Sequence, residues 1–275
     1  MSIVRRCLRL QGTAGVWAAL WAVALTAVLG TTPHTARAQD AGKASKLPYY
    51  EVSGGGEVAG PAWSAYASTT IALSAMGIGS PAGIQEDGWR LRTGAGYWQY
   101  SDRPVKWVPG VGETRVALKR NGSFADMLLG YHRSFGSLTV KAYGGVAYSN
   151  ETWLRDGVDD GSPGSELAAK FLAETWLNLT PVSFAQLDAG WTSLQNTITA
   201  RARLGYRITP QLSLGPEGGY WSAIDTETNA GVTAWRYGGF VRFEWESGEI
   251  SLSAGAADDA YDTHFYATVN ALIRF

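Results

Sequence analysis

The feature that most constrains this chain is the unbroken two-residue alternation of its last eleven residues, 265–275. One parity is apolar throughout, and the other is polar apart from Leu272; the apolar set is Phe265, Ala267, Val269, Ala271, Ile273 and Phe275. Successive side chains of a strand point to opposite faces, so the segment predicts a strand with one apolar and one polar face. A terminal strand that ends on an aromatic residue is typical of chains that insert into a bacterial outer membrane, where lipid contacts the apolar face.

The amino-terminal segment predicts export. Arg5, Arg6 and Arg9 precede an apolar run at 16–29, and a small-x-small cleavage site follows at 36–38, as in a secretory signal peptide. The run is 14 residues long, shorter than the roughly 20 apolar residues that a spanning helix needs. We therefore expect a cleaved signal peptide at 1–38, a flexible periplasmic leader at 39–48 and one barrel domain at 49–275.

Charge and cysteine usage narrow the function classes. Cleavage after Ala38 would remove four arginines and no acid, leaving 19 Lys and Arg against 24 Asp and Glu, a net charge of −5. A net negative chain disfavours nucleic acid as a partner. The single cysteine, Cys7, lies inside the expected signal peptide, so the mature chain has no disulfide. The glycine runs at 54–56 and 218–219 lack the lysine of a phosphate-binding loop, and we expect no cofactor.

Twelve strands are expected in the remaining chain, with boundaries good to a few residues. They lie at roughly 49–57, 63–75, 87–101, 122–134, 137–149, 165–179, 182–194, 196–208, 211–222, 231–246, 248–257 and 263–275. Tight connections at 134–137, 179–182, 209–210 and 247–248 predict periplasmic turns, and longer polar ones at 102–121, 150–164, 223–230 and 257–262 predict external loops. The connection at 76–86 departs from this asymmetry, because it is long yet falls on the periplasmic side.

Alternation within the strands predicts the fold class. In the strand 196–208 the even positions from 198 onward are apolar, whereas the odd positions carry Thr, Gly and three arginines; 231–246 repeats the alternation. In hydrocarbon each unpaired backbone amide would cost several kcal/mol, so such a sheet must close on itself. The prediction is an all-β protein, a closed antiparallel transmembrane β-barrel of about 12 strands.

A soluble periplasmic sandwich or lipocalin-like barrel is the alternative, with the apolar face forming its core. The polar parity, however, is rich in glycine, arginine and aromatic residues. The apolar parity carries aromatic residues near the strand ends, as membrane interfaces require, namely Tyr97, Tyr148, Trp191, Tyr237 and Trp245. These features favour the membrane barrel.

The inward parity collects mixed charges and aromatic rings. The charges pair across neighbouring strands or line a selective conduit. The rings fill a narrow interior, or they stack on the C–H faces of pyranoses while charged groups hydrogen-bond the hydroxyls. The candidate ligand-binding residues are Arg90, Arg92, Trp98, Tyr100, Trp176, Arg201, Arg203, Glu217, Trp221, Arg236 and Arg242.

Catalysis and metal binding have weaker signals. His132 and Ser134 have the H-x-S spacing seen in outer-membrane lipid A deacylases, but the following strand segment 138–148 contains no acid to orient the imidazole. We expect no catalytic residue; an enzyme that modifies lipid or glycan, such as a deacylase-like barrel, is the alternative. The acidic loops match no calcium-binding spacing, and we expect no metal site at Asp156, Asp159, Asp160, Asp258, Asp259 and Asp262.

Four short segments carry a family resemblance. The segment 87–92 (DGWRLR) leads through Gly94, Gly96 and Tyr97 to Tyr100; it is followed by 214–217 (LGPE), 236–240 (RYGGF) and the closing 273–275 (IRF). Together they resemble the cellulose biosynthesis protein BcsS family, over most of the mature chain.

The resemblance implies an outer-membrane accessory protein of bacterial cellulose or exopolysaccharide secretion. It would assist passage or surface presentation of the glucan. The implied partners are outer-membrane lipid, a glucan polymer and secretion subunits of a cellulose synthase, and a barrel that only anchors such a complex stays open. The resemblance adds no site residues.

Overall fold

The computed structural model describes residues 48–78, 82–102, 105–108, 112–115, 117–155, 158–159, 161–224, 231–258 and 263–275. The expected signal peptide, 1–38, and all of the expected leader except Pro48 lie outside these ranges. Within them, no helix combines the length and the hydropathy of a membrane-spanning helix.

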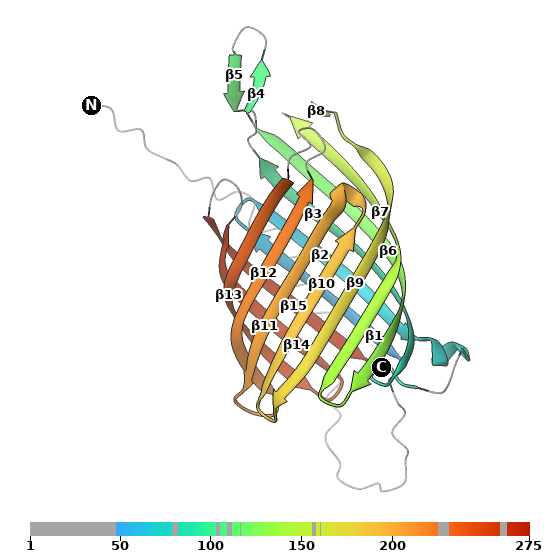
Figure 1. The fold of residues 1–275 in the computed structure, drawn as a ribbon. Coiled ribbons are helices and arrows are strands. Elements are labelled where there is room, and N and C mark those ends of the chain that lie inside the picture. Colours follow the sequence, from blue (N-terminus) through green and yellow to red (C-terminus); the bar gives the residue numbers. More distant parts are fainter. Residues whose placement is uncertain are drawn as a thin grey trace, which may run out of the picture. The chain divides into compact units, whose positions relative to one another are not determined.

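Twelve antiparallel strands form a closed barrel (Figure 1). In chain order they are β1 (Tyr50–Ala59), β2 (Ala62–Ala72), β3 (Gly88–Asp102), β6 (Leu118–Phe135), β7 (Leu138–Arg155), β9 (Gly164–Thr180), β10 (Ser183–Thr192), β11 (Thr197–Arg207), β12 (Leu212–Ile224), β13 (Gly231–Trp245), β14 (Gly248–Asp258) and β15 (Thr263–Arg274). Each strand pairs with its sequence neighbours in the barrel, and β1 pairs with β15 from Glu51–Arg274 to Ala59–Tyr266. The predicted fold class is confirmed.

Five shorter elements lie in the connections. The strands β4 (Val105–Val108) and β5 (Gly112–Arg115) pair only with each other, and β8 (Val158–Asp159) pairs with the end of β7. The 3-10 helices η1 (Leu73–Met76) and η2 (Leu194–Asn196) follow β2 and β10. A hairpin inside the expected loop 102–121 was not predicted from the sequence.

The two ends of the barrel differ in their connections. We call the end with the tight connections at 136–137, 181–182 and 246–247 the turn end, and the opposite end the loop end. Gly136 has a φ of +64°, a left-handed conformation that glycine adopts without a steric cost. The loop end carries the longer connections, as expected, but two of its connections are short: 60–61 between β1 and β2, and 193–196 with η2.

Strands β6 and β7 continue farther toward the loop end than the sequence indicated. They were expected to begin at 122 and to end at 149, and they reach Leu118 and Arg155. Buried side chains account for this extension, since Leu118, Arg120 and Trp153 are all enclosed and the guanidinium of Arg120 lies 4.3 Å from the ring centroid of Trp153. Burial of Trp153 and its contact with a cation favour continued pairing there.

The two faces of the barrel have opposite character. Outward positions expose large apolar side chains, among them Met127, Leu167, Phe171, Leu204 and Tyr237. The inward face holds the enclosed residues of the strands, and twelve of those described are polar or charged: Ser68, Thr70, Arg90, Arg120, His132, Arg203, Ser213, Glu217, Arg242, Ser251, Ser253 and Thr268. The core of the molecule is therefore its lumen, and the expected assignment of apolar and polar parities to the outside and the inside agrees with the observed burial.

Candidate functional site

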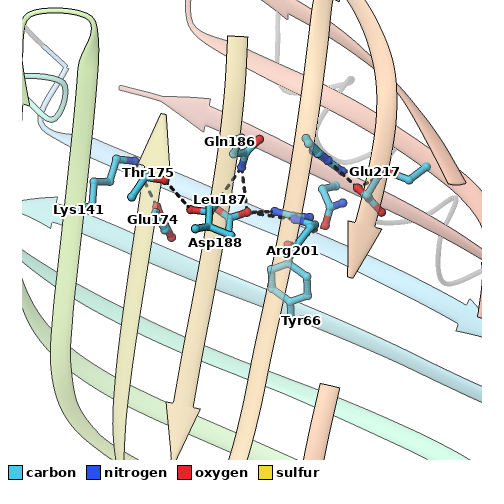
Figure 2. A network of polar contacts seen from close by, with 12 residues as sticks. Tyr66, Lys141, Glu174, Thr175, Gln186, Leu187, Asp188, Arg201 and Glu217 are labelled. Carbon is cyan, nitrogen blue, oxygen red and sulfur yellow. Dashed lines mark hydrogen bonds and ion pairs between the residues drawn. The ribbon is translucent and has the colours of Figure 1, made fainter. Parts of the chain in front are cut away.

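The described charged side chains of the lumen wall are organised by the strand register. Lys141 on β7 lies opposite Glu174 on β9, Glu174 lies opposite Asp188 on β10, and Asp188 lies opposite Arg201 on β11. Figure 2 shows these side chains following one another across the wall. Two acids directly opposite each other would repel, so each needs its own cation.

Both acids of this row are neutralised. Glu174 pairs with Nη1 of Arg92 at 2.5 Å and with Nζ of Lys141 at 3.5 Å. Asp188 accepts hydrogen bonds from Nε and Nη2 of Arg201 at 3.0 and 2.6 Å, and from Nε2 of Gln186 at 2.9 Å (Figure 2). The predicted site residues Arg92 and Arg201 thus engage the wall itself.

A second group, the closed network, consists of Arg203, Glu217, Ser253 and Tyr266. Nε of Arg203 donates to Oε2 of Glu217 at 2.6 Å, and its Nη2 donates to Oγ of Ser253 at 2.9 Å. Glu217 also accepts from the hydroxyls of Ser253 at 3.1 Å and Tyr266 at 3.3 Å. The side chains of Arg203 and Glu217 are only 4% and 1% exposed, and a charge pair buried this deeply is stable only with such additional partners.

The other charged wall residues pair in the same manner. Lys170 pairs with Asp126, Arg236 with Glu57, and Arg242 with both Glu244 and Glu249. Two inward arginines hydrogen-bond differently. Arg90 donates to the carbonyls of Trp89, Gly83 and Glu86, and Arg207 donates to the carbonyl of Pro181 and to Asn178.

Arg90 holds the long connection at the turn end. Its Nη2 donates to the carbonyl of Gly83 at 2.8 Å, and the amide of Ile84 donates to the carbonyl of Pro48 at 2.6 Å. Ile84 and Ala82 are buried, as is Arg90 itself. The unexpectedly long connection near 76–86 is therefore pinned against the start of β3 by a predicted site residue.

Most aromatic rings of the lumen have ring or cation partners. Trp176 stacks on Phe184 with centroids 4.0 Å apart, and the guanidinium of Arg242 lies 4.5 Å from the Trp176 centroid. Toward the loop end, Trp98 stacks on Tyr100 at 5.6 Å, and Arg120 lies 5.5 Å from the Tyr100 ring. These contacts resemble the packing of a core, in which each ring is worth more than its buried area alone.

Two inward rings differ from this pattern. Most large apolar side chains that are exposed on the described barrel strands point outward. Tyr66 on β2 and Trp221 on β12 point inward, because each lies an even number of residues from an enclosed residue of its strand, Ser68 and Glu217 respectively. They are 37% and 39% exposed, and neither has a ring or cation partner within the described part of the chain. The sequence prediction contained Trp221 and missed Tyr66, although the polar neighbours Ser64, Ser68 and Thr70 of the same parity signal its inward direction.

A cavity of about 140 Å³ lies in the wall beside Tyr66. Its lining includes the predicted residues Arg201 and Arg236, together with residues that the sequence did not single out: Gly56, Glu57, Ser64, Tyr66, Thr268 and Asn270. The hydroxyl of Tyr66 donates to Oδ1 of Asn270 at 2.8 Å. The other nine predicted residues, Arg90, Arg92, Trp98, Tyr100, Trp176, Arg203, Glu217, Trp221 and Arg242, do not line it.

The described residues contain no cluster of three or more His, Cys, Asp or Glu side chains that could hold a metal ion. In the acidic loop after β7, hydrogen bonds from the backbone amide and the hydroxyl of Ser162 hold the pKa of the Asp159 carboxyl below its ordinary value. Asp258, the last residue of β14, accepts a hydrogen bond from Thr263. The remaining acids of the loops after β7 and β14 lie outside the described residues, namely Asp156, Asp160, Asp259 and Asp262.

His132 and Ser134 lie near the turn end of β6. His132 is buried, and the nearby Asp87 carboxylate accepts the backbone amide of Ser134 at 2.8 Å and pairs with Arg133 at 3.1 Å. Within the described part of the chain, no hydrogen bond connects the His132 ring to Ser134 or to Asp87. A base, a nucleophile and an orienting acid in mutual contact are what a hydrolytic triad needs.

The model of one protein family, described as cellulose biosynthesis protein BcsS, matches residues 52–275. The chain belongs to this family. The resemblance seen in the sequence is confirmed, and the match covers all twelve barrel strands apart from the first two residues of β1. Comparison with curated proteins gives no match.

Three solved structures of bacterial proteins are similar to this chain, and one of the three has a TM-score above 0.5. The chain is similar to the transport unit of the autotransporter AIDA-I from Escherichia coli, with a TM-score of 0.51, 10% identity and coverage of 93% of this chain and 98% of that one. It is also similar to the COG4313 outer membrane channel from Pseudomonas putida F1, with a TM-score of 0.47, 12% identity and coverage of 87% and 100%. For a KdgM porin the values are 0.46, 9%, 82% and 99%. At these identities the similarity concerns the fold alone.

Proposed function

We propose that this BcsS-family barrel resides in the bacterial outer membrane and that its lumen accommodates a neutral glucan during cellulose biosynthesis. The family match supports the link to cellulose, and the exposed apolar side chains of the outward face support contact with lipid. The sequence predicts both the link to cellulose and the contact with lipid, and the paired charges of the lumen wall add the nature of the polymer.

The observation that carries the proposal is the pairing of charges along the lumen. The cations Arg92, Lys141, Lys170, Arg201, Arg203, Arg236 and Arg242 each pair with a carboxylate. An acidic polysaccharide would need cations that are free of such partners, as anion-selective pores provide them. Arg90 and Arg207, which pair with no carboxylate among the described residues, donate to backbone carbonyls and to Asn178. A wall of paired charges instead offers many hydrogen-bonding groups at little net charge, which suits the hydroxyls of an uncharged sugar polymer.

The proposal assigns no chemistry to the barrel. Free energy for moving the polymer would come from the synthase, and the barrel would cooperate with its secretion subunits. The described His132 and Ser134 lack the connecting hydrogen bond that would support a deacylase, and no observation of the lumen wall favours that alternative.

Conductance measurements test the proposal. Purified full-length protein in planar lipid bilayers should give discrete conductance steps, and cello-oligosaccharides should reduce them. An oligomer of β-1,4-linked glucuronate of the same length is the matched control, because it differs from a cello-oligosaccharide only in the carboxylate that replaces the hydroxymethyl group of each unit, and it should have a much weaker effect.

Two results would contradict the proposal. Protein that neither conducts nor binds cello-oligosaccharides is not a glucan barrel. Stronger block by the acidic oligosaccharide than by the neutral one would contradict the inference from paired charges.

A further inference from the structure

The cavity beside Tyr66 forms where the first and last strands meet. Tyr66 comes from β2, and Thr268 and Asn270 come from β15, with β1 between them. Gly55 on β1 is paired with both Tyr66 and Asn270. A β-carbon at Gly55 would lie 2.6 Å from Oδ1 of Asn270 and 3.0 Å from Cε1 of Tyr66, so only glycine lets the tyrosine cross β1 to reach the amide.

Two polar atoms in this lining have no partner among the described residues. Nδ2 of Asn270 and Oγ1 of Thr268 are both buried and both make no hydrogen bond. Leaving buried donors and acceptors unpaired is costly, and such groups in a native fold call for an explanation. The side-chain oxygen of Asn270 already accepts a hydrogen bond from the hydroxyl of Tyr66, so the group of Asn270 that is left without a partner among the described residues is its amide nitrogen, a donor.

The lining matches a ligand that is rich in hydroxyl groups and has no charge. Asn270 supplies a donor, Thr268 a donor and an acceptor, and the ring of Tyr66 a partly exposed apolar surface. The two arginines of the lining are already matched, Arg201 with Asp188 and Arg236 with Glu57. A ligand carboxylate would therefore find no unpaired arginine here and would lie close to Glu57.

The size of the cavity limits the ligand further. A volume of about 140 Å³ holds on the order of ten water-sized groups, comparable to the non-hydrogen atoms of one hexose unit. A chain of such units could place one ring here while its neighbours continue along the lumen.

We propose that the cavity formed by Tyr66, Thr268 and Asn270 is a subsite for one neutral hexopyranose unit of a glucan. The proposal rests on the proposed function, because it requires that the lumen meets the polymer. It adds the place of contact and the groups that make it. In the bound state the side chains of Asn270 and Thr268, whose Nδ2 and Oγ1 atoms are covered in this structure, turn toward the cavity and hydrogen-bond two sugar hydroxyls, and the ring lies against Tyr66.

Binding of cellotetraose to purified full-length protein in detergent, measured by calorimetry, tests the subsite. Asn270→Asp keeps the acceptor for Tyr66 and removes the unused donor. Thr268→Val removes the hydroxyl with little change of shape. Each variant should weaken cellotetraose binding by about fivefold to tenfold, the effect of one lost hydrogen bond.

Thr70→Val is the matched control. Thr70 is a buried, inward threonine on the same strand as Tyr66, and it lies outside the cavity. This variant should bind cellotetraose like the wild type. Folding of all variants is checked by the shift in gel mobility that barrel proteins show on heating, and Thr268→Val provides the test if Asn270→Asp fails to fold.

The outcomes separate the two proposals. Wild-type binding that the two cavity variants weaken and the control does not supports the subsite. Wild-type binding that both cavity variants retain overturns the subsite and leaves the glucan function intact. Absence of wild-type binding to cellotetraose, together with absence of conductance, overturns both.

Discussion

The closed network and the Tyr66 cavity are built from similar polar side chains, but within the described part of the chain the hydrogen-bonding groups have partners in the first and lack some of them in the second. In the closed network, Arg203, Glu217, Ser253 and Tyr266 satisfy one another. In the cavity, Asn270 and Thr268 each keep a buried atom without a partner among the described residues. A polar lumen residue is therefore not by itself evidence of a binding site. What distinguishes the two regions is whether the wall has already used the hydrogen-bonding capacity of its side chains.

Replacing a glutamate by glutamine, once in the closed network and once in the cavity lining, gives the largest expected difference in unfolding free energy. Glu217→Gln removes the charge that compensates a buried arginine, and we expect a loss of about 3 kcal/mol in unfolding free energy. Glu57→Gln breaks a pair whose acid is 35% exposed, and the loss should stay below about 1 kcal/mol. Urea unfolding of both variants in detergent, followed by tryptophan fluorescence, measures the difference. Equal losses would mean that burial does not separate the two regions.

A smaller contrast concerns the glycines of the wall. A β-carbon at Gly205 would lie 2.1 Å from Cζ of the buried Phe184, so Gly205→Ala should cost about 2 kcal/mol through overpacking. At Gly218 the nearest atom would be 3.9 Å away, and Gly218→Ala is the control. The same unfolding assay applies, and cellotetraose affinity should be unchanged in both. If the Gly205→Ala protein were as stable as the Gly218→Ala protein, the ring of Phe184 would be free to move away from the added methyl group.

The smallest contrast concerns two of the three tryptophans of the predicted site, Trp176 and Trp221. Trp221 has no ring or cation partner among the described residues, so Trp221→Leu should change unfolding free energy by less than about 0.5 kcal/mol. Trp176 packs against Phe184 and Arg242, and Trp176→Leu should cost about 1.5 kcal/mol. Reversed effects in thermal unfolding would show that the ring contacts do not stabilise the barrel.

Sequence alternation was enough to predict the closed barrel and the direction in which side chains such as Arg203 and Trp221 point. It works because the two-residue period of a strand is set by backbone geometry, and because the outward parity of this chain is apolar, as it is in barrels that face lipid. The extension of β6 and β7 escaped the prediction, because it depends on the packing of Arg120 against Trp153, which lie 33 positions apart. The hairpin of β4 and β5 was not predicted either.

Partners within the lumen could not be predicted in the same way. The hydrogen bond between Tyr66 and Asn270 joins residues 204 positions apart, and it depends on the register in which β1 meets β15. Parity assigns a residue to a face and leaves its depth and its neighbours undetermined. The difference between the stacked ring of Trp176 and the open ring of Tyr66 therefore appears only once all strands are paired.

The Tyr66 cavity can form only after β1 has paired with β15 and the barrel has closed. Its tyrosine lies on β2, near the amino-terminal edge of the sheet, and its amide lies on β15 at the carboxyl-terminal edge, so a sheet that has not yet closed has neither the hydrogen bond nor the pocket. Only a finished cylinder can recognise a sugar there. Any occupant of the pocket would in turn hold β2 and β15 together across the seam that closes the barrel.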